Sequence, residues 1–171
     1  MNSKVEQALN EQIHAEFFSF YLYLSVAAYF KDLHLDGFAH WMRIQAQEEF
    51  GHAMKLFDYL NERGGKVELL PLDAPTNAWS SPSKAVEAVL NHERAISERI
   101  NRLVDLATAE NDHATTVVLH WYVNEQVEEE STADTLFHQV KMVESSPHGL
   151  LMIDRELAGR PAPAAIDAGG E

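Results

Sequence analysis

Four glutamates stand where apolar side chains would be expected, and they are the residues most able to do chemistry. Each interrupts the apolar stripe of a different helix-period segment, near its middle: Glu16, Glu49, Glu93 and Glu129. If these stripes form one core, four carboxylates meet inside it. An ionised carboxylate is very costly to bury alone, and several together repel one another and take up protons. Bound cations remove both problems, so the pattern predicts a metal site.

A histidine beside one of these acids supports the same prediction. His52 follows Glu49 by three residues, so both side chains lie on one helical face and can ligate a single metal ion. Glu-x-x-His is the motif that supplies ligands in di-iron carboxylate bundles. In the second half of the chain Thr132 stands three residues after Glu129. The two metal positions should therefore differ, one having an imidazole and the other nearly all oxygen ligands.

The composition narrows the choice of metal and of partner. The chain has no cysteine, which excludes disulfides, thiolate zinc sites, iron–sulfur clusters and a cysteine nucleophile. Carboxylates with a little imidazole suit Fe, Mn, Mg or Ca. The 171 residues include 13 Lys and Arg against 27 Asp and Glu, a net charge of −14. Such a chain attracts cations and lacks the basic surface that a nucleic acid requires.

The most apolar stretch of the chain, residues 17–30, is too short to span a bilayer and is typical of a buried helix. The first residues show no apolar region of a secretory signal. We therefore expect no membrane partner and a cytoplasmic location.

Four long segments have apolar residues at steps of three and four, which predicts four long helices. They span residues 4–31, 36–63, 82–107 and from just after 112 to about 144. Gly64 and Gly65 end the second helix, and Ser81 with Pro82 begins the third. Pro147 and Gly149 are expected to end the fourth, and residues 149–157 to form a short fifth helix.

The connections between these helices predict how the bundle is threaded. Short links join the first helix to the second and the third to the fourth, so each pair should be antiparallel. Residues 64–81 contain Pro71 and Pro75 and show no helical period. This long link could cross the length of the bundle and leave helices two and three parallel. The sequence thus predicts an all-α domain over residues 1–158, a four-helix bundle with one long crossover, and a disordered tail over 159–171.

Around the predicted ligands the chain resembles the bacterial non-haem ferritins of the ferritin-like di-iron family. The resemblance covers about residues 1–158. It rests on a set of local motifs: Asn10-Glu11-Gln12 with Glu16, Ala46-Gln47-Glu48-Glu49-x-x-His52, His92-Glu93, Trp121-Tyr122-Val123-x-Glu125-Gln126-x-Glu128-Glu129-Glu130, and Ile153-Asp154-Arg155-Glu156-Leu157.

This resemblance implies roles for individual residues. It assigns a first iron to Glu16, Glu49 and His52, with Glu49 bridging to a second iron held by Glu93 and Glu129. Gln126 would orient bound water or dioxygen, and Tyr23 would lie beside the centre as an additional electron donor or as a core aromatic. A third, weaker iron site would comprise Glu48, Glu125, Glu128 and Glu129.

The resemblance also implies iron storage and detoxification, with ferroxidase activity. Dioxygen or hydrogen peroxide would oxidise Fe(II) to Fe(III), and ferric mineral would collect inside a twenty-four-subunit shell. Haem is not expected. Bacterioferritins bind haem through a Met just after the bridging Glu, where this chain has Phe50, and Thr132 replaces their second motif histidine.

Two other functions stay open at this point. A rubrerythrin-like or other di-iron peroxidase without storage would share the bundle, although the rubrerythrin form usually adds a cysteine-rich iron domain. A metal-free structural bundle would share the helices, but it predicts neutral or apolar residues at the four glutamate positions.

Overall fold

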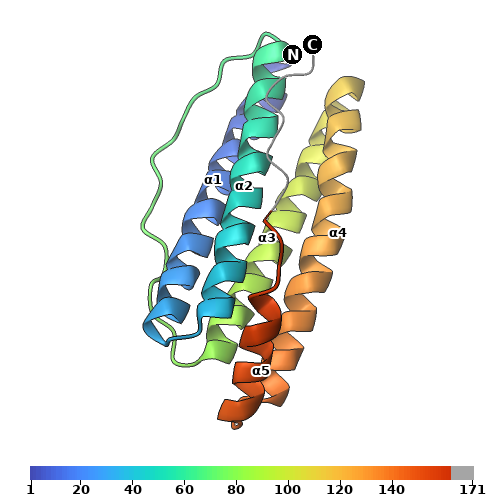
Figure 1. Ribbon diagram of the computed structural model, residues 1–171. Coiled ribbons are helices and arrows are strands. Elements are labelled where there is room, and N and C mark those ends of the chain that lie inside the picture. The colour runs from blue at the N-terminus through green and yellow to red at the C-terminus, as the bar shows by residue number, and fades with distance from the viewer. Residues whose placement is uncertain (163–171) are drawn as a thin grey trace.

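The computed structural model describes residues 1–162, and these form five helices and no strand. The helices are α1 (Ser3–Asp32), α2 (Asp36–Glu62), α3 (Pro82–Ala109), α4 (His113–Met142) and α5 (Pro147–Leu157). The first four form an elongated bundle, and α5 lies at one end against α2 and α4 (Figure 1). The all-α prediction is confirmed, as is the short fifth helix.

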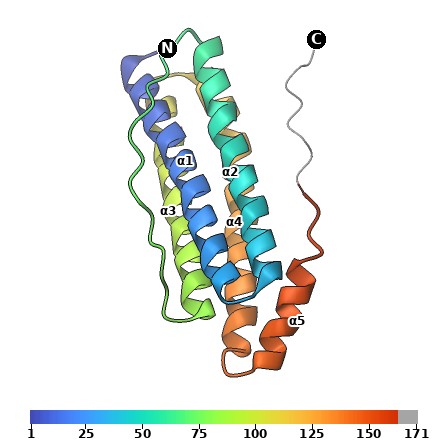
Figure 2. The same ribbon diagram turned by 60° about the vertical axis from the view of Figure 1, so that its left-hand side comes forward.

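The long crossover is also as predicted. After α2 the chain returns along the outside of the bundle, so α2 and α3 run in the same direction (Figures 1 and 2). The returning segment is held against α1 by hydrogen bonds. Asn10 Oδ1 accepts from the Glu68 amide at 2.7 Å, and Ser25 donates to the Thr76 carbonyl at 2.7 Å. Within each antiparallel pair, α1 packs against α2 and α3 packs against α4.

Helix ends follow local capping chemistry. Asn2, Ser81, Asp112 and Ser146 each accept an amide hydrogen bond at the start of a helix. One boundary differs from the prediction: α4 ends at Met142, and Pro147 opens α5 rather than ending α4. Proline suits the first turn of a helix because its missing N–H would have no intrahelical partner there.

The interior consists of two apolar clusters at opposite ends of the bundle. One contains Phe30, Phe38, Met42 and Val140, and the other contains Leu9, Leu56, Ile100 and Leu119. The predicted ligands fall between these clusters on all four long helices. Among residues 1–162, no helix is long and apolar enough to cross a membrane. The predicted tail, 159–171, lies mostly outside the described residues.

Candidate metal centre

A layer of buried polar side chains separates the two apolar clusters. Glu16 from α1, Glu49 from α2 and Glu93 from α3 are each at most 2% exposed, and Gln126 from α4 is 6% exposed. Glu129, one turn further along α4, is half-buried. The structure therefore places three of the four predicted acids in one buried layer and Glu129 at its edge.

Three of these residues form a compact ligand set. One donor atom from each of Glu16, Glu49 and His52 lies within 4.8 Å of the others, and all three residues are buried. His52 Nδ1 is 3.7 Å from Glu49 Oε2. The Tyr122 hydroxyl donates to the His52 carbonyl at 2.8 Å and joins α4 to α2 at this level. Such a set of two carboxylates and one imidazole suits a divalent transition metal.

The other two acids are held by neutral donors. The Tyr23 hydroxyl donates to Glu93 Oε1 at 2.6 Å, and Gln126 Nε2 donates to Glu93 Oε2 at 3.2 Å. Gln45 Nε2 donates to Glu129 Oε2 at 2.7 Å. Tyr23 and Gln126, both predicted as site residues, thus contact one of the site's carboxylates directly.

Two carboxylate oxygens in this layer have no hydrogen-bond donor within residues 1–162. Glu16 Oε2 and Glu49 Oε1 are buried, and neither accepts a hydrogen bond. A buried unsatisfied acceptor costs free energy, and an ionised one costs more. Both residues belong to the compact set, so a cation bound there would compensate the charge of both carboxylates. The residues present therefore fit a metal ion.

The raised pKa values of the buried acids also favour a metal ion in this layer. Burial first, and then the neighbouring carboxylates, raise the pKa of Glu49 well above its usual value. Burial raises the pKa of Glu93 to about 7, against the hydrogen bonds from Tyr23 and Gln126. Burial and the charge of Glu93 raise the pKa of Glu129 to about 8. Without metal the layer therefore holds protons, which metal ions would displace.

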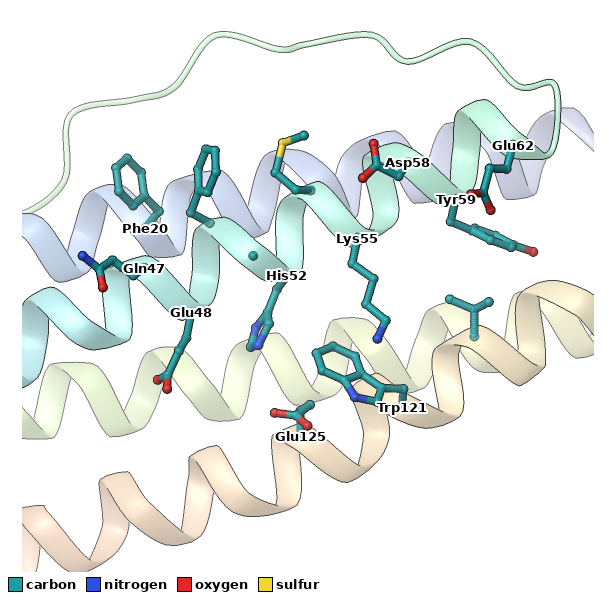
Figure 3. Close-up of a pocket in the computed structure, with 14 residues that line it drawn as sticks. Phe20, Gln47, Glu48, His52, Lys55, Asp58, Tyr59, Glu62, Trp121 and Glu125 are labelled. Carbon is teal, nitrogen blue, oxygen red and sulfur yellow. The ribbon is translucent and has the colours of Figure 1, made fainter. Parts of the chain in front are cut away.

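A groove of about 1030 Å³ opens beside this layer. Its walls are mainly α2 and α4, with Phe20 of α1 at one side. Within the described residues, the Cα atoms of α2 and α4 are everywhere more than 8 Å apart. His52 and Glu48 on α2 face Glu125 on α4 across it (Figure 3). Lys55 Nζ lies 3.6 Å from the centroid of the Trp121 ring on the same walls. The imidazole of the ligand set is thus reached from this side of the bundle.

The acids of the predicted third iron site do not form one cluster within residues 1–162. Glu48 pairs with Arg160 at 2.7 Å, and Glu128 is exposed. Glu125 lines the groove. The third site stays a prediction.

Sequence reasoning missed two buried glutamines that bind the site's carboxylates. Gln12 donates to Glu16 Oε1 at 2.8 Å, and Gln45 donates to Glu129. Each glutamine stands four residues before a ligand glutamate, on the same apolar face. The sequence did contain a signal for both glutamines, because each is a polar residue inside an apolar stripe, one helical turn before a predicted ligand.

Comparison with known proteins decides the family. Residues 6–143 match the ferritin family, described as a ferritin-like domain. The chain belongs to the ferritin family. It is 42% identical to a bacterial non-heme ferritin of Bacteroides fragilis over 160 residues, which cover 94% of this chain and 99% of the relative. A bacterial non-heme ferritin of Staphylococcus epidermidis is 36% identical over 160 residues, 94% and 96% of the two chains.

Solved ferritin structures agree with the fold. The open pore ferritin of the archaeon Archaeoglobus fulgidus superposes with a TM-score of 0.93 at 46% identity, covering 94% of this chain and 98% of that one. The ferritin family and the shared fold support iron storage as the general function of the chain.

Proposed function

We propose that this ferritin is a ferroxidase that oxidises Fe(II) at a dinuclear centre in the polar layer and delivers Fe(III) for storage. The observation that carries the proposal is that Glu16 and Glu49, which cluster with His52, each have a buried carboxylate oxygen with no hydrogen-bond partner within residues 1–162. A purely structural bundle gains nothing from burying ionisable groups without partners.

In this proposal Fe(II) is the substrate, and the protein supplies the ligands. Glu16, Glu49 and His52 bind one iron, and Glu49 bridges to a second iron bound by Glu93 and Glu129. Bridging suits Glu49, because its Oε1 has no hydrogen bond. Carboxylates stabilise Fe(III) over Fe(II), since hard, charged ligands favour the higher oxidation state. Each Fe(II) gives up one electron to dioxygen or hydrogen peroxide.

The remaining residues act around the metals. Gln126 and Tyr23 hold the two oxygens of Glu93 from opposite helices, so that this carboxylate keeps one orientation. In this proposal Gln126 also orients a bound water or dioxygen, and Tyr23 donates a further electron. Glu48, Glu125 and Glu128 would take up iron at the groove, with Glu129, as a third site.

The storage part of the proposal requires an assembled shell. We propose a twenty-four-subunit hollow particle in the cytoplasm, in which the Fe(III) product collects as mineral.

The test is aerobic addition of Fe(II) to the metal-free protein, followed by absorbance near the ultraviolet. We expect Glu93→Ala to slow the initial rate by at least tenfold, because the second iron loses a ligand. Glu98→Ala is the matched control, since Glu98 is an exposed residue of the same helix. Equal rates in wild type and Glu93→Ala would overturn the ferroxidase proposal.

A further inference from the structure

The ligand Glu16 is approached on one side by a two-residue chain of hydrogen bonds that starts on α3. Arg99 Nε donates to Gln12 Oε1 at 3.3 Å, and Gln12 Nε2 donates to Glu16 Oε1 at 2.8 Å. Arg99 is tied to α1 a second time, because its Nη2 donates to the Glu11 carbonyl at 2.9 Å. Gln12 itself is only 2% exposed. The guanidinium therefore determines which way the buried amide faces.

The hydrogen bond from Gln12 gives the two oxygens of the Glu16 carboxylate different surroundings. Oε1 is occupied by the Gln12 amide, whereas Oε2 is buried without a partner. A metal ion bound with Glu49 and His52 can then use Oε2 and leave Oε1 where it is. A rotation that brought both oxygens to the metal would break a buried hydrogen bond, which is costly.

The arrangement also leaves the Glu16 carboxylate without a direct ion pair to Arg99. A lysine or arginine bonded directly to Glu16 would neutralise it and compete with the metal. Here the Arg99 guanidinium binds Gln12 rather than Glu16. It therefore polarises the amide donor without contacting the carboxylate. The comparison with Gln45 is informative, because Gln45 donates to Glu129 in the same way but its own Oε1 has no partner. Within residues 1–162, the Gln12 amide is thus fixed through both its oxygen and its nitrogen, and the Gln45 amide only through its nitrogen.

We propose that Gln12, held in place by Arg99, is a positioning residue that restricts Glu16 to binding metal through Oε2 alone. The inference rests on the proposed metal centre and adds a property to it. The first ion would then have a low coordination number and an open position, because Glu16 would bind it through one oxygen and not two.

Cobalt(II) tests this without any turnover, because its visible absorption is intense at low coordination number and weak at six. We would titrate the metal-free protein with Co(II) and record the spectrum and affinity of the first equivalent. Gln12→Met keeps the length of the side chain and removes the amide. We expect it to lower the absorption of the first ion at least twofold, because Glu16 can then bind through both oxygens and the coordination number rises. Arg99→Met should shift the spectrum in the same direction by a smaller factor.

Two exposed residues supply matched controls. Arg102→Met removes the same charge from α3, and Gln7→Met makes the same change on α1. Both should match wild type. Failure of the wild type to bind Co(II) would overturn the metal centre itself. Binding by wild type with an unchanged spectrum in Gln12→Met would overturn only the positioning role. Should Gln12→Met not fold, Arg99→Met decides: a weakened spectrum supports the role, and an unchanged one overturns it.

Discussion

At the scale of single residues, the buried carboxylates of the polar layer bind protons when no metal ion is bound. Glu93 and Glu129 have pKa values of about 7 and about 8, raised chiefly by burial, against a usual value of 4.5. The folded, metal-free protein therefore binds protons near neutral pH that the unfolded chain has already released. By linkage, its free energy of unfolding falls as the pH rises through this range.

This predicts a thermal stability of the metal-free protein that decreases with pH. Between pH 6 and pH 9 the raised pKa values of Glu93 and Glu129 are crossed, over about one and two pH units. Each unit corresponds to about 1.4 kcal/mol, so we expect Tm to fall by about 10 °C. Calorimetry in the presence of a chelator measures it. In the double variant Glu93→Gln, Glu129→Gln the same pH range should have a much smaller effect. A wild-type Tm that stays constant or rises with pH would contradict the pKa assignment.

At the scale of helices, both antiparallel pairs supply acids to the polar layer, but these acids are held in different ways. The α1–α2 pair supplies Glu16, Glu49 and His52, which converge within 4.8 Å. The α3–α4 pair supplies Glu93 and Glu129, which neutral donors from α1 and α2 hold in place. The α3–α4 pair therefore depends on the α1–α2 pair for the orientation of its acids, and the polar layer requires both pairs.

The short α5 is joined to α2 by a close backbone contact. A Cβ on Gly37 would stand 1.6 Å from the Asp154 carbonyl oxygen, and Asp154 Oδ1 accepts from the Phe38 amide at 3.0 Å. Only a residue without a side chain allows this approach. Ile153 is 9% exposed as a consequence of the docking.

Gly37→Ala should therefore displace α5 from α2. We expect a loss of about 1–3 kcal/mol in the free energy of unfolding, typical of overpacking against backbone, and faster proteolysis near residues 143–158. Gly159→Ala is a suitable control, because its Cβ would meet a single atom, the Glu156 carbonyl oxygen, at 3.3 Å. Wild-type stability and proteolysis in Gly37→Ala would show that α5 does not depend on this contact.

At the scale of the whole molecule, large apolar side chains remain exposed on one part of the surface. Leu69, Leu70 and Leu72 lie on the returning segment, and Tyr21 and Leu24 lie on α1, which that segment follows (Figure 2). Exposed apolar side chains on two neighbouring segments are typical of an interface between proteins. The proposed shell would bury such a surface between copies of the chain.

The purified protein should accordingly elute as a particle many times the 19.3 kDa mass of one chain, measured by size exclusion with light scattering. Electron microscopy after iron loading should show a dense core inside it. A monomer or dimer that still oxidises Fe(II) would keep the ferroxidase proposal and remove the shell. That result would favour the alternative of a di-iron peroxidase without storage.

The sequence by itself determined the helices and the phase of their ligands. Helix formation and capping depend on neighbours within a few residues, so Ser81 with Pro82 identified the start of α3. The spacing of Glu49 and His52 sufficed to place both on one face. Local rules also made Pro147 ambiguous, since proline can follow one helix or open the next, and the Ser146 cap resolved it.

Only the tertiary structure decided which atoms meet. Gln45 stands one turn before Glu49 yet donates to Glu129 on α4, and Arg160 pairs with Glu48 on α2. No sequence spacing contains these pairings, because they depend on the rotation and axial shift of one helix against another. The same packing leaves Glu16 Oε2 and Glu49 Oε1 free. The chemistry of the site lies in that difference between bonded and free oxygens, which only the assembled bundle creates.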